Sequence, residues 1–240
     1  MSESLVPDQV NQLLLDVKDL IVDTNVISAV TNEVPGIRLL EVGNQIWNHY
    51  KELKMKKFFR GLSKEIEVNG YSVSNKIKLE NYLKDDFTRA SFFNILDNAL
   101  EASSELCSEM LGYYAGLVLQ SSERLSYNHT IIINALKNLN DWDLINFKKA
   151  YEFFTILPDD QPINSICLYK KVPLKSLEKD KDEMEKLIYD EEFNAFKSTI
   201  IKLANLQVFN TSQIVFSADP HTYTKTKASD EMFHLVKLFV

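Results

Sequence analysis

Glycine and proline are scarce in this chain of 240 residues, with six of each. Both residues are typical of tight turns, and a protein built from many short strands needs many such turns. An all-β architecture is therefore disfavoured. The low content of turn residues favours long helices, and the length suffices for one large or two small domains with a substantial core.

Cysteine and long apolar runs are also nearly absent. Cys107 and Cys167 are the only two cysteines and no CxxC motif occurs, so we expect two reduced thiols. The first residues, MSESLVPDQV, lack the apolar core of a secretory signal. No apolar run reaches the ~18 residues that span a bilayer. We therefore predict a cytoplasmic chain without a transmembrane segment.

Motifs of the common enzyme classes are missing as well. The sequence contains no GxSxG nucleophile elbow, no glycine-rich phosphate loop and no HExxH zinc motif. The histidines lie apart, and Asp219, His221 and His234 would meet at a metal only if the C-terminal residues folded back, which their spacing does not require. We predict no catalytic residue, cofactor or metal site, and an enzyme is the less favoured alternative.

Arginine and net positive charge are lacking too. Only four of the 27 basic residues are arginine, and the formal net charge is −7. Arginine is the preferred residue for bidentate phosphate contacts, and a negative chain is repelled by nucleic acids and anionic membranes. This composition disfavours such partners for the molecule as a whole but allows a local basic patch.

Amphipathic helices are what the sequence has in abundance. The 3.6-residue apolar period predicts helices over residues 8–21, 37–66, 131–139 and 192–206, and a helical hairpin over 86–120. Gly112 and Gly116 lie inside the second helix of this hairpin, where each costs about 1 kcal/mol of helix propensity. We predict that they let a neighbouring helix pack closely, with residues 131–139 as the candidate.

The string Asn140-Asp141-Trp142-Asp143 is acidic and precedes a further helical stretch. It admits two interpretations, which are a metal site and a helix cap followed by a first turn. We favour the cap, supplied by Asn140 or Asp141.

The most basic stretch is the second half of the helix predicted over 37–66. A basic amphipathic helix docks on acidic partners or anionic membranes, but the same pattern describes the solvated face of a core helix. Both interpretations stay open. The candidates for partner or membrane contact are Lys54, Lys56, Lys57 and Arg60.

A linker over residues 157–162, LPDDQP, divides the chain into a helical bundle domain (1–158) and a smaller α/β module (163–240). In this module the helix over 192–206 precedes two β-rich segments, 213–217 and 221–226, and a last helix capped by Ser229. We predict a mostly α fold, with a multi-helix N-terminal bundle and a small winged-helix-like C-terminal module.

In DNA-binding winged helices, the helix before the wing reads the major groove. The segments KLANLQVF (Lys202 to Phe209) and YTKTKASDEMFHLV (Tyr223 to Val236) resemble the ends of bacterial winged-helix proteins. The candidate nucleic-acid contacts are Asn194, Lys197, Ser198, Lys202, Lys225 and Lys227.

Residues 51–154 resemble a group of helical proteins from bacteria and prophages, some of them abortive-infection proteins of the Abi-alpha type. The segments that carry the resemblance are KKFFRGLSKEI (56–66), LGYYAGLVL (111–119) and INALKNLNDWDLINFKKAYE (133–152). The resemblance implies a role in phage–host conflict and transfers no functional residue.

We therefore expect a non-enzymatic interaction or regulatory protein, in phage defence or counter-defence, whose partner is a protein. A DNA-binding regulator that uses the C-terminal module and a protein that docks on membranes through residues 51–64 are the alternatives. The sequence predicts neither the partner's identity nor the oligomeric state.

Overall fold

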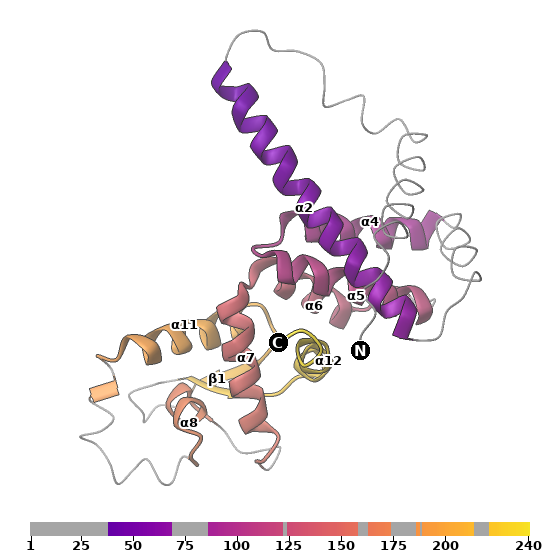
Figure 1. Cartoon of the computed structure of the whole chain (residues 1–240). Helices are drawn as coiled ribbons and strands as arrows, with labels where there is room; N and C mark the ends of the chain where they lie inside the picture. The colour runs from indigo at the N-terminus through magenta and orange to yellow at the C-terminus, as the bar shows by residue number, and fades with distance from the viewer. Residues whose placement is uncertain are drawn as a thin grey trace, which may run out of the picture. The chain divides into compact units, whose positions relative to one another are not determined.

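The computed structural model describes residues 38–68, 86–121, 124–157, 163–173, 186–187, 189–213 and 221–240. In these ranges the chain forms eight helices and one two-stranded antiparallel sheet near its C-terminal end (Figure 1). The predicted mostly α fold is confirmed. The helix predicted over residues 8–21 lies outside the described residues.

The chain divides into two compact units. The N-terminal unit comprises Met1–Glu101 and Ser108–Glu123, and the C-terminal unit comprises Ala102–Cys107 and Arg124–Val240. The linker predicted near residue 160 falls largely in residues 158–162, which lie outside the described ranges. The residues on both sides of it belong to the C-terminal unit.

The described part of the N-terminal unit consists of three helices. They are α2 (Arg38–Val68), α4 (Asp86–Glu101) and most of α5 (Glu105–Ser121). The long helix and the helical hairpin predicted from the apolar period are confirmed. Phe58 of α2 makes edge-to-face contacts with Phe59 and with Phe92 of α4, with ring centroids 5.4 and 5.7 Å apart. Leu62 completes this buried face of α2.

The crossing of α2 and α5 leaves no space for a side chain at two glycines. A β-carbon on Gly112 of α5 would lie 1.8 Å from the carbonyl oxygen of Phe58, and one on Gly61 of α2 would lie 1.8 Å from the carbonyl oxygen of Glu109. Such contacts are far below van der Waals distance, so only glycine allows the two backbones to come this close.

Gly116 faces a side chain of α2 instead of its backbone, because a β-carbon there would lie 2.7 Å from a carboxylate oxygen of Glu65. The predicted close packing at Gly112 and Gly116 is confirmed. The neighbouring helix, however, is α2 and not residues 131–139, since the nearest atoms at both glycines belong to α2. The period of one helix marks its buried face but does not identify the helix that covers it.

The C-terminal unit contains α6 (Tyr127–Asn138), α7 (Asp141–Phe154), α8 (Ser165–Lys170), α11 (Glu191–Asn205) and α12 (Lys227–Val236). Asn140 is the N-cap of α7, as predicted, and forms a capping box with Asp143. The predicted helix 131–139 begins earlier because Ser126 caps α6.

The last helix shows a correction. Thr226 is the N-cap of α12 and accepts a hydrogen bond from the backbone N–H of Ser229, whose own side chain accepts one from the N–H of Thr226. The predicted cap, Ser229, is therefore the third helical residue, which completes the capping box.

The sheet pairs β1 (Asn210–Gln213) with β2 (His221–Thr224), in a register that sets Asn210 opposite Thr224 and Gln213 opposite His221. The antiparallel pairing is confirmed, but the first strand begins three residues before the predicted segment 213–217. Residues 214–220 lie outside the described ranges. The second strand ends before Thr226, which caps α12 instead.

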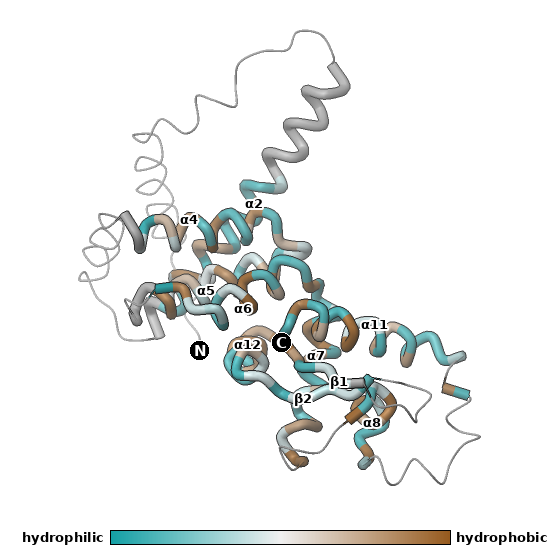
Figure 2. Tube along the Cα trace, turned by 180° about the vertical axis from the view of Figure 1, so that it is seen from behind, coloured by the Kyte–Doolittle hydropathy of each residue, from teal (hydrophilic) through white to brown (hydrophobic). Residues whose placement is uncertain are grey.

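Aromatic side chains of α7 form the centre of the C-terminal unit. The ring centroids of Phe147 and Phe154 lie 5.7 and 5.2 Å from that of Phe209, which precedes β1. Tyr151 stacks on Phe233 of α12 at 4.2 Å. Hydrophobic and hydrophilic residues alternate around α7 and α11 (Figure 2), as expected for helices with one buried side.

Candidate functional site

The outward side of α7 carries large apolar side chains in solvent. Trp142, Ile145 and Ile156 are 76%, 37% and 73% exposed. Lys149 and Glu152 are exposed between them, and the spacing of three and four residues places the members on one side of the helix. We call these five residues the α7 face. Ile156 follows the helix end by two residues and is held by a backbone hydrogen bond to Phe153.

The opposite side of α7 packs in the core of the unit. Its residues Leu144, Phe147, Ala150 and Tyr151 are at most 6% exposed. Helices α8, α11 and α12 cover this buried part of α7. The exposed apolar residues are therefore not a second core stripe, because α7 already has its packing partners.

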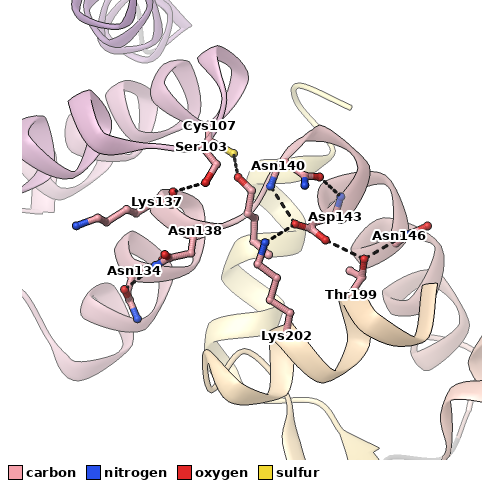
Figure 3. A network of polar contacts seen from close by, with 11 residues as sticks. Ser103, Cys107, Asn134, Lys137, Asn138, Asn140, Asp143, Asn146, Thr199 and Lys202 are labelled. Atoms are coloured by element: carbon pink, nitrogen blue, oxygen red, sulfur yellow. Dashed lines mark hydrogen bonds and ion pairs between the residues drawn. The ribbon is translucent and has the colours of Figure 1, made fainter. Parts of the chain in front are cut away.

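A buried carboxylate fixes the orientation of α7. Asp143 is 7% exposed and accepts hydrogen bonds from the hydroxyl of Thr199 (2.8 Å), the ammonium of Lys202 (2.7 Å) and the backbone N–H of Asn140 (3.1 Å) (Figure 3). Asn146 donates a further bond to the Thr199 hydroxyl at 3.2 Å. Charge-assisted hydrogen bonds are the stronger class, so this network ties α11 to one side of α7.

The α7 face is not among the sites that the sequence predicts. The sequence predicts Trp142 only as part of a helix cap and first turn, and it assigns no role to Ile145 or Ile156. The sequence does contain an indication of this face. Residues 142, 145, 149 and 152 repeat at helical spacing, next to the buried set 144, 147, 151 and 154. The two sets differ in polarity only at Lys149 and Glu152, so the sequence does not show which apolar residues stay exposed.

The six residues predicted to contact nucleic acid lie on α11 and around α12. Asn194 and Ser198 are exposed on α11, Lys197 is half-buried, and Lys225 just before α12 is half-buried as well. Asp190 caps α11, and the exposed Glu191 and Glu192 occupy its first turn. The first turn of the proposed recognition helix is thus acidic, which repels phosphate.

Two of the four predicted lysines are paired with carboxylates inside the unit. Lys202 lies 2.7 Å from the buried Asp143, and Lys227 lies 3.7 Å from Glu231. Lys227 is 80% exposed, so its pair is weak, whereas Lys202 holds a buried acid. Movement of Lys202 to a DNA phosphate would leave the Asp143 carboxylate without its counter-charge.

The basic half of α2 is largely occupied by contacts within the N-terminal unit. Lys54 is 3% exposed, donates to the carbonyl oxygen of Leu100 at 3.3 Å, and lies over the ring of Tyr50 at 4.2 Å. Lys56 pairs with Glu52 at 2.8 Å on the surface, and Lys57 is half-buried.

A buried acidic residue on α5 forms ion pairs with two further basic side chains of α2. Glu109 is 6% exposed, and its carboxylate lies 2.9 Å from the ammonium of Lys64 and 3.5 Å from the guanidinium of Arg60. A membrane-docking helix inserts its apolar side, but Phe58 and Leu62 on that side of α2 are fully buried. Between Tyr50 and Glu65, where the side chains of α2 are described, its contacts are those of a core helix.

Burial raises the pKa of several titratable groups among the described residues. Desolvation raises the pKa of the Cys107 thiol to about 11, and it also raises the pKa of Asp97, Tyr113 and Tyr169 above their ordinary values. Burial therefore favours the protonated, neutral form of each of these four groups. No group of three or more His, Cys, Asp or Glu residues in the described ranges is placed to hold a metal ion.

Within the part of the chain that the structure describes, no helix is long and apolar enough to cross a membrane. No protein-family model matches the chain, and neither a curated protein nor a solved structure is significantly similar to it. The α7 face is therefore identified as the candidate functional site from its geometry alone.

Proposed function

We propose that this chain is a non-enzymatic interaction protein that binds another protein through the α7 face. The observation that carries the proposal is the exposure of Trp142 in the first turn of α7 and of Ile156 two residues after its end. Each is about three quarters in solvent, while the opposite side of α7 packs in a core. Scattered apolar residues are normal on protein surfaces, but large ones aligned on one rigid helix form a binding surface.

The energetics favour Trp142 as the anchor of such a contact. Tryptophan is enriched among the residues that dominate interface free energies, because it buries a large area with few rotatable bonds. An aromatic side chain buries ~150–250 Å², which at ~25 cal/mol per Å² corresponds to about 4–6 kcal/mol before the costs of association. The neighbouring Lys149 and Glu152 supply polar contacts that orient a partner.

The occupied lysines support a protein partner over DNA. Lys202 is paired with Asp143 and Lys227 with Glu231, and the first turn of α11 is acidic. The resemblance to abortive-infection proteins of the Abi-alpha type supports a place in phage defence or counter-defence for this interaction. In that context, we expect Trp142→Asp to abolish any effect of the chain on phage plating efficiency while its cellular level stays unchanged.

Photo-crosslinking in cells tests the proposed function. A benzophenone amino acid replaces Trp142 in the full chain, and the same amino acid at Lys227, which is 80% exposed but lies outside the α7 face, is the matched control. We expect a protein adduct of defined mass from position 142, lost when Ile156→Asp is added, and none from position 227. Equal crosslinking at both positions, or none at 142, would contradict the proposal.

A further inference from the structure

The α7 face has opposite charges between two apolar ends. Lys149 and Glu152 are exposed, and neither forms an ion pair in the part of the chain that the structure describes. Ile145 precedes them, and Ile156 follows them. A partner surface that matches this face therefore needs an apolar residue at each end. Between these ends it needs a carboxylate opposite Lys149 and a basic group opposite Glu152.

The α7 face itself meets that requirement when it is turned around. Consider two α7 helices packed antiparallel, with the two-fold axis crossing the helices midway between residues 150 and 151. In this arrangement, Lys149 lies opposite Glu152 of the second copy. The same axis places Ile145 opposite Ile156 of the second copy, because both residue pairs share this midpoint. A two-fold interface is self-complementary, so each contact then occurs twice.

We infer that a second copy of this chain, packed antiparallel on the α7 face, is the partner that this surface binds. This inference rests on the proposed function and names the partner of the same site. A parallel pairing in register is excluded by charge, since Lys149 would meet Lys149 and Glu152 would meet Glu152. Trp142 lies about 4.5 Å further along the axis than Ile145, within reach of Ile156 of the second copy.

The size of the contact predicts a weak and reversible dimer. One pair of helices buries less than the ~1,200 Å² at which stable interfaces begin. The two reciprocal Lys149–Glu152 pairs then contribute specificity by opposing other registers. We expect a dissociation constant in the micromolar range, on the order of the weak complexes in this size class.

Charge reversal in the full chain tests the pairing by sedimentation velocity over a range of concentrations. Lys149→Glu alone and Glu152→Lys alone each turn two attractive pairs into two repulsive ones, so each variant should dimerise at least tenfold more weakly than the wild type. The double variant Lys149→Glu/Glu152→Lys should dimerise like the wild type. An equimolar mixture of the two single variants should form heterodimers, because the two carboxylates at positions 149 and 152 of one chain then face two lysines of the other.

Each remaining outcome overturns the inference. A wild-type chain that stays monomeric up to about 100 μM shows that the surface binds something else. If the single variants dimerise like the wild type, the dimer interface lies elsewhere on the chain. If the mixture of the two single variants stays monomeric, the antiparallel register is excluded. Lys148→Glu, a half-buried lysine beside the face, is the control for a change in net charge. A monomeric chain that still crosslinks from position 142 to a different protein would overturn the dimer and leave the proposed function standing.

Discussion

A β-carbon on Gly112 would lie 1.8 Å from the carbonyl oxygen of Phe58, a backbone atom in the middle of α2. Gly112→Ala should therefore destabilise the N-terminal unit by about 1–3 kcal/mol, the usual range for overpacking. A contact of 1.8 Å with a backbone atom favours the upper end of this range, where the loss exceeds the gain of about 1 kcal/mol that alanine brings to a helix interior. Urea denaturation followed by circular dichroism measures the change.

Gly116→Ala is the matched comparison on the same helix. Its β-carbon would meet side-chain atoms of Glu65, at 2.7 Å from a carboxylate oxygen, 3.0 Å from Cβ and 3.1 Å from Cγ, and not a backbone atom. We expect a smaller destabilisation than for Gly112→Ala, since the gain in helix propensity is the same for both. Equal stability of the two variants would show that α2 and α5 do not cross at these glycines.

Asp143→Asn should loosen the contact between α7 and α11. The amide keeps the shape of the side chain but removes the charge that binds Lys202 and the hydroxyl of Thr199. Hydrogen bonds to charged groups contribute about 1.5–3 kcal/mol, and we expect a loss of stability in that range. The control is Asp141→Asn, an exposed acid in the same first turn, for which about 0.3–1 kcal/mol is expected. A larger effect at Asp141 would contradict the network.

Both cysteines should be unreactive in the folded chain. Cys107 and Cys167 are buried, the thiol of Cys107 donates to the carbonyl oxygen of Leu139 at 3.2 Å, and its pKa is about 11. The thiolate is the reactive form, so it is scarce at neutral pH. Titration with a chromogenic disulfide at pH 8 should detect no fast thiol in the native chain and two in denaturant. One fast thiol in the native chain would contradict the described packing.

The raised thiol pKa also predicts a loss of stability in alkali. The folded chain holds the Cys107 proton up to about pH 11, whereas the ordinary thiol value is 9.0. Between these values the folded state binds more protons, so the free energy of unfolding falls as pH rises, by up to roughly 1.4 kcal/mol per pH unit. Cys107→Ala lacks this contribution, so its stability should fall less steeply from pH 9 to 11. Identical slopes would refute the assignment.

DNA should bind this chain weakly and without preference. Phosphate contacts make affinity fall steeply with salt, and a chain of net charge −7 with Lys202 and Lys227 paired to acids has few to offer. Fluorescence anisotropy of labelled duplex DNA should therefore show no strong binding from ~50 to ~200 mM salt. Tight binding that weakens with salt and with Lys197→Ala would restore the DNA-binding alternative.

The helices could be predicted from the sequence because their apolar period is local. Residues 37–66 and 86–120 repeat buried positions every three or four residues, and the helices lie where the period places them. The N-cap residue of a helix is harder to predict than the helix itself. Thr226 and Ser229 both have a hydroxyl that can cap a helix, and both take part in one capping box. The extended backbone of Thr226, which the structure shows and the sequence does not, assigns the N-cap to this residue.

The roles of the charged residues could not be predicted, because their partners lie far away in the sequence. Lys202 pairs with Asp143, 59 residues before it, and Lys64 pairs with Glu109, 45 residues after it. Without these contacts, the lysines of α2 and α11 have the pattern of free basic surfaces. The α7 face was missed for a related reason, since exposure of Trp142 depends on which side of α7 the other helices cover.

Protection of a single introduced cysteine tests the central claim, that protein covers the α7 face. Because Cys107 and Cys167 are buried, Ile145→Cys places the one reactive thiol of the chain in this face, and Lys227→Cys places it at an exposed control position. Both variants should react readily with a maleimide as dilute purified proteins. In intact cells that contain the chain well above the micromolar dissociation constant of the dimer, we expect the thiol at 145 to react several-fold more slowly than the thiol at 227. Equal reaction rates at the two positions in cells would contradict the account.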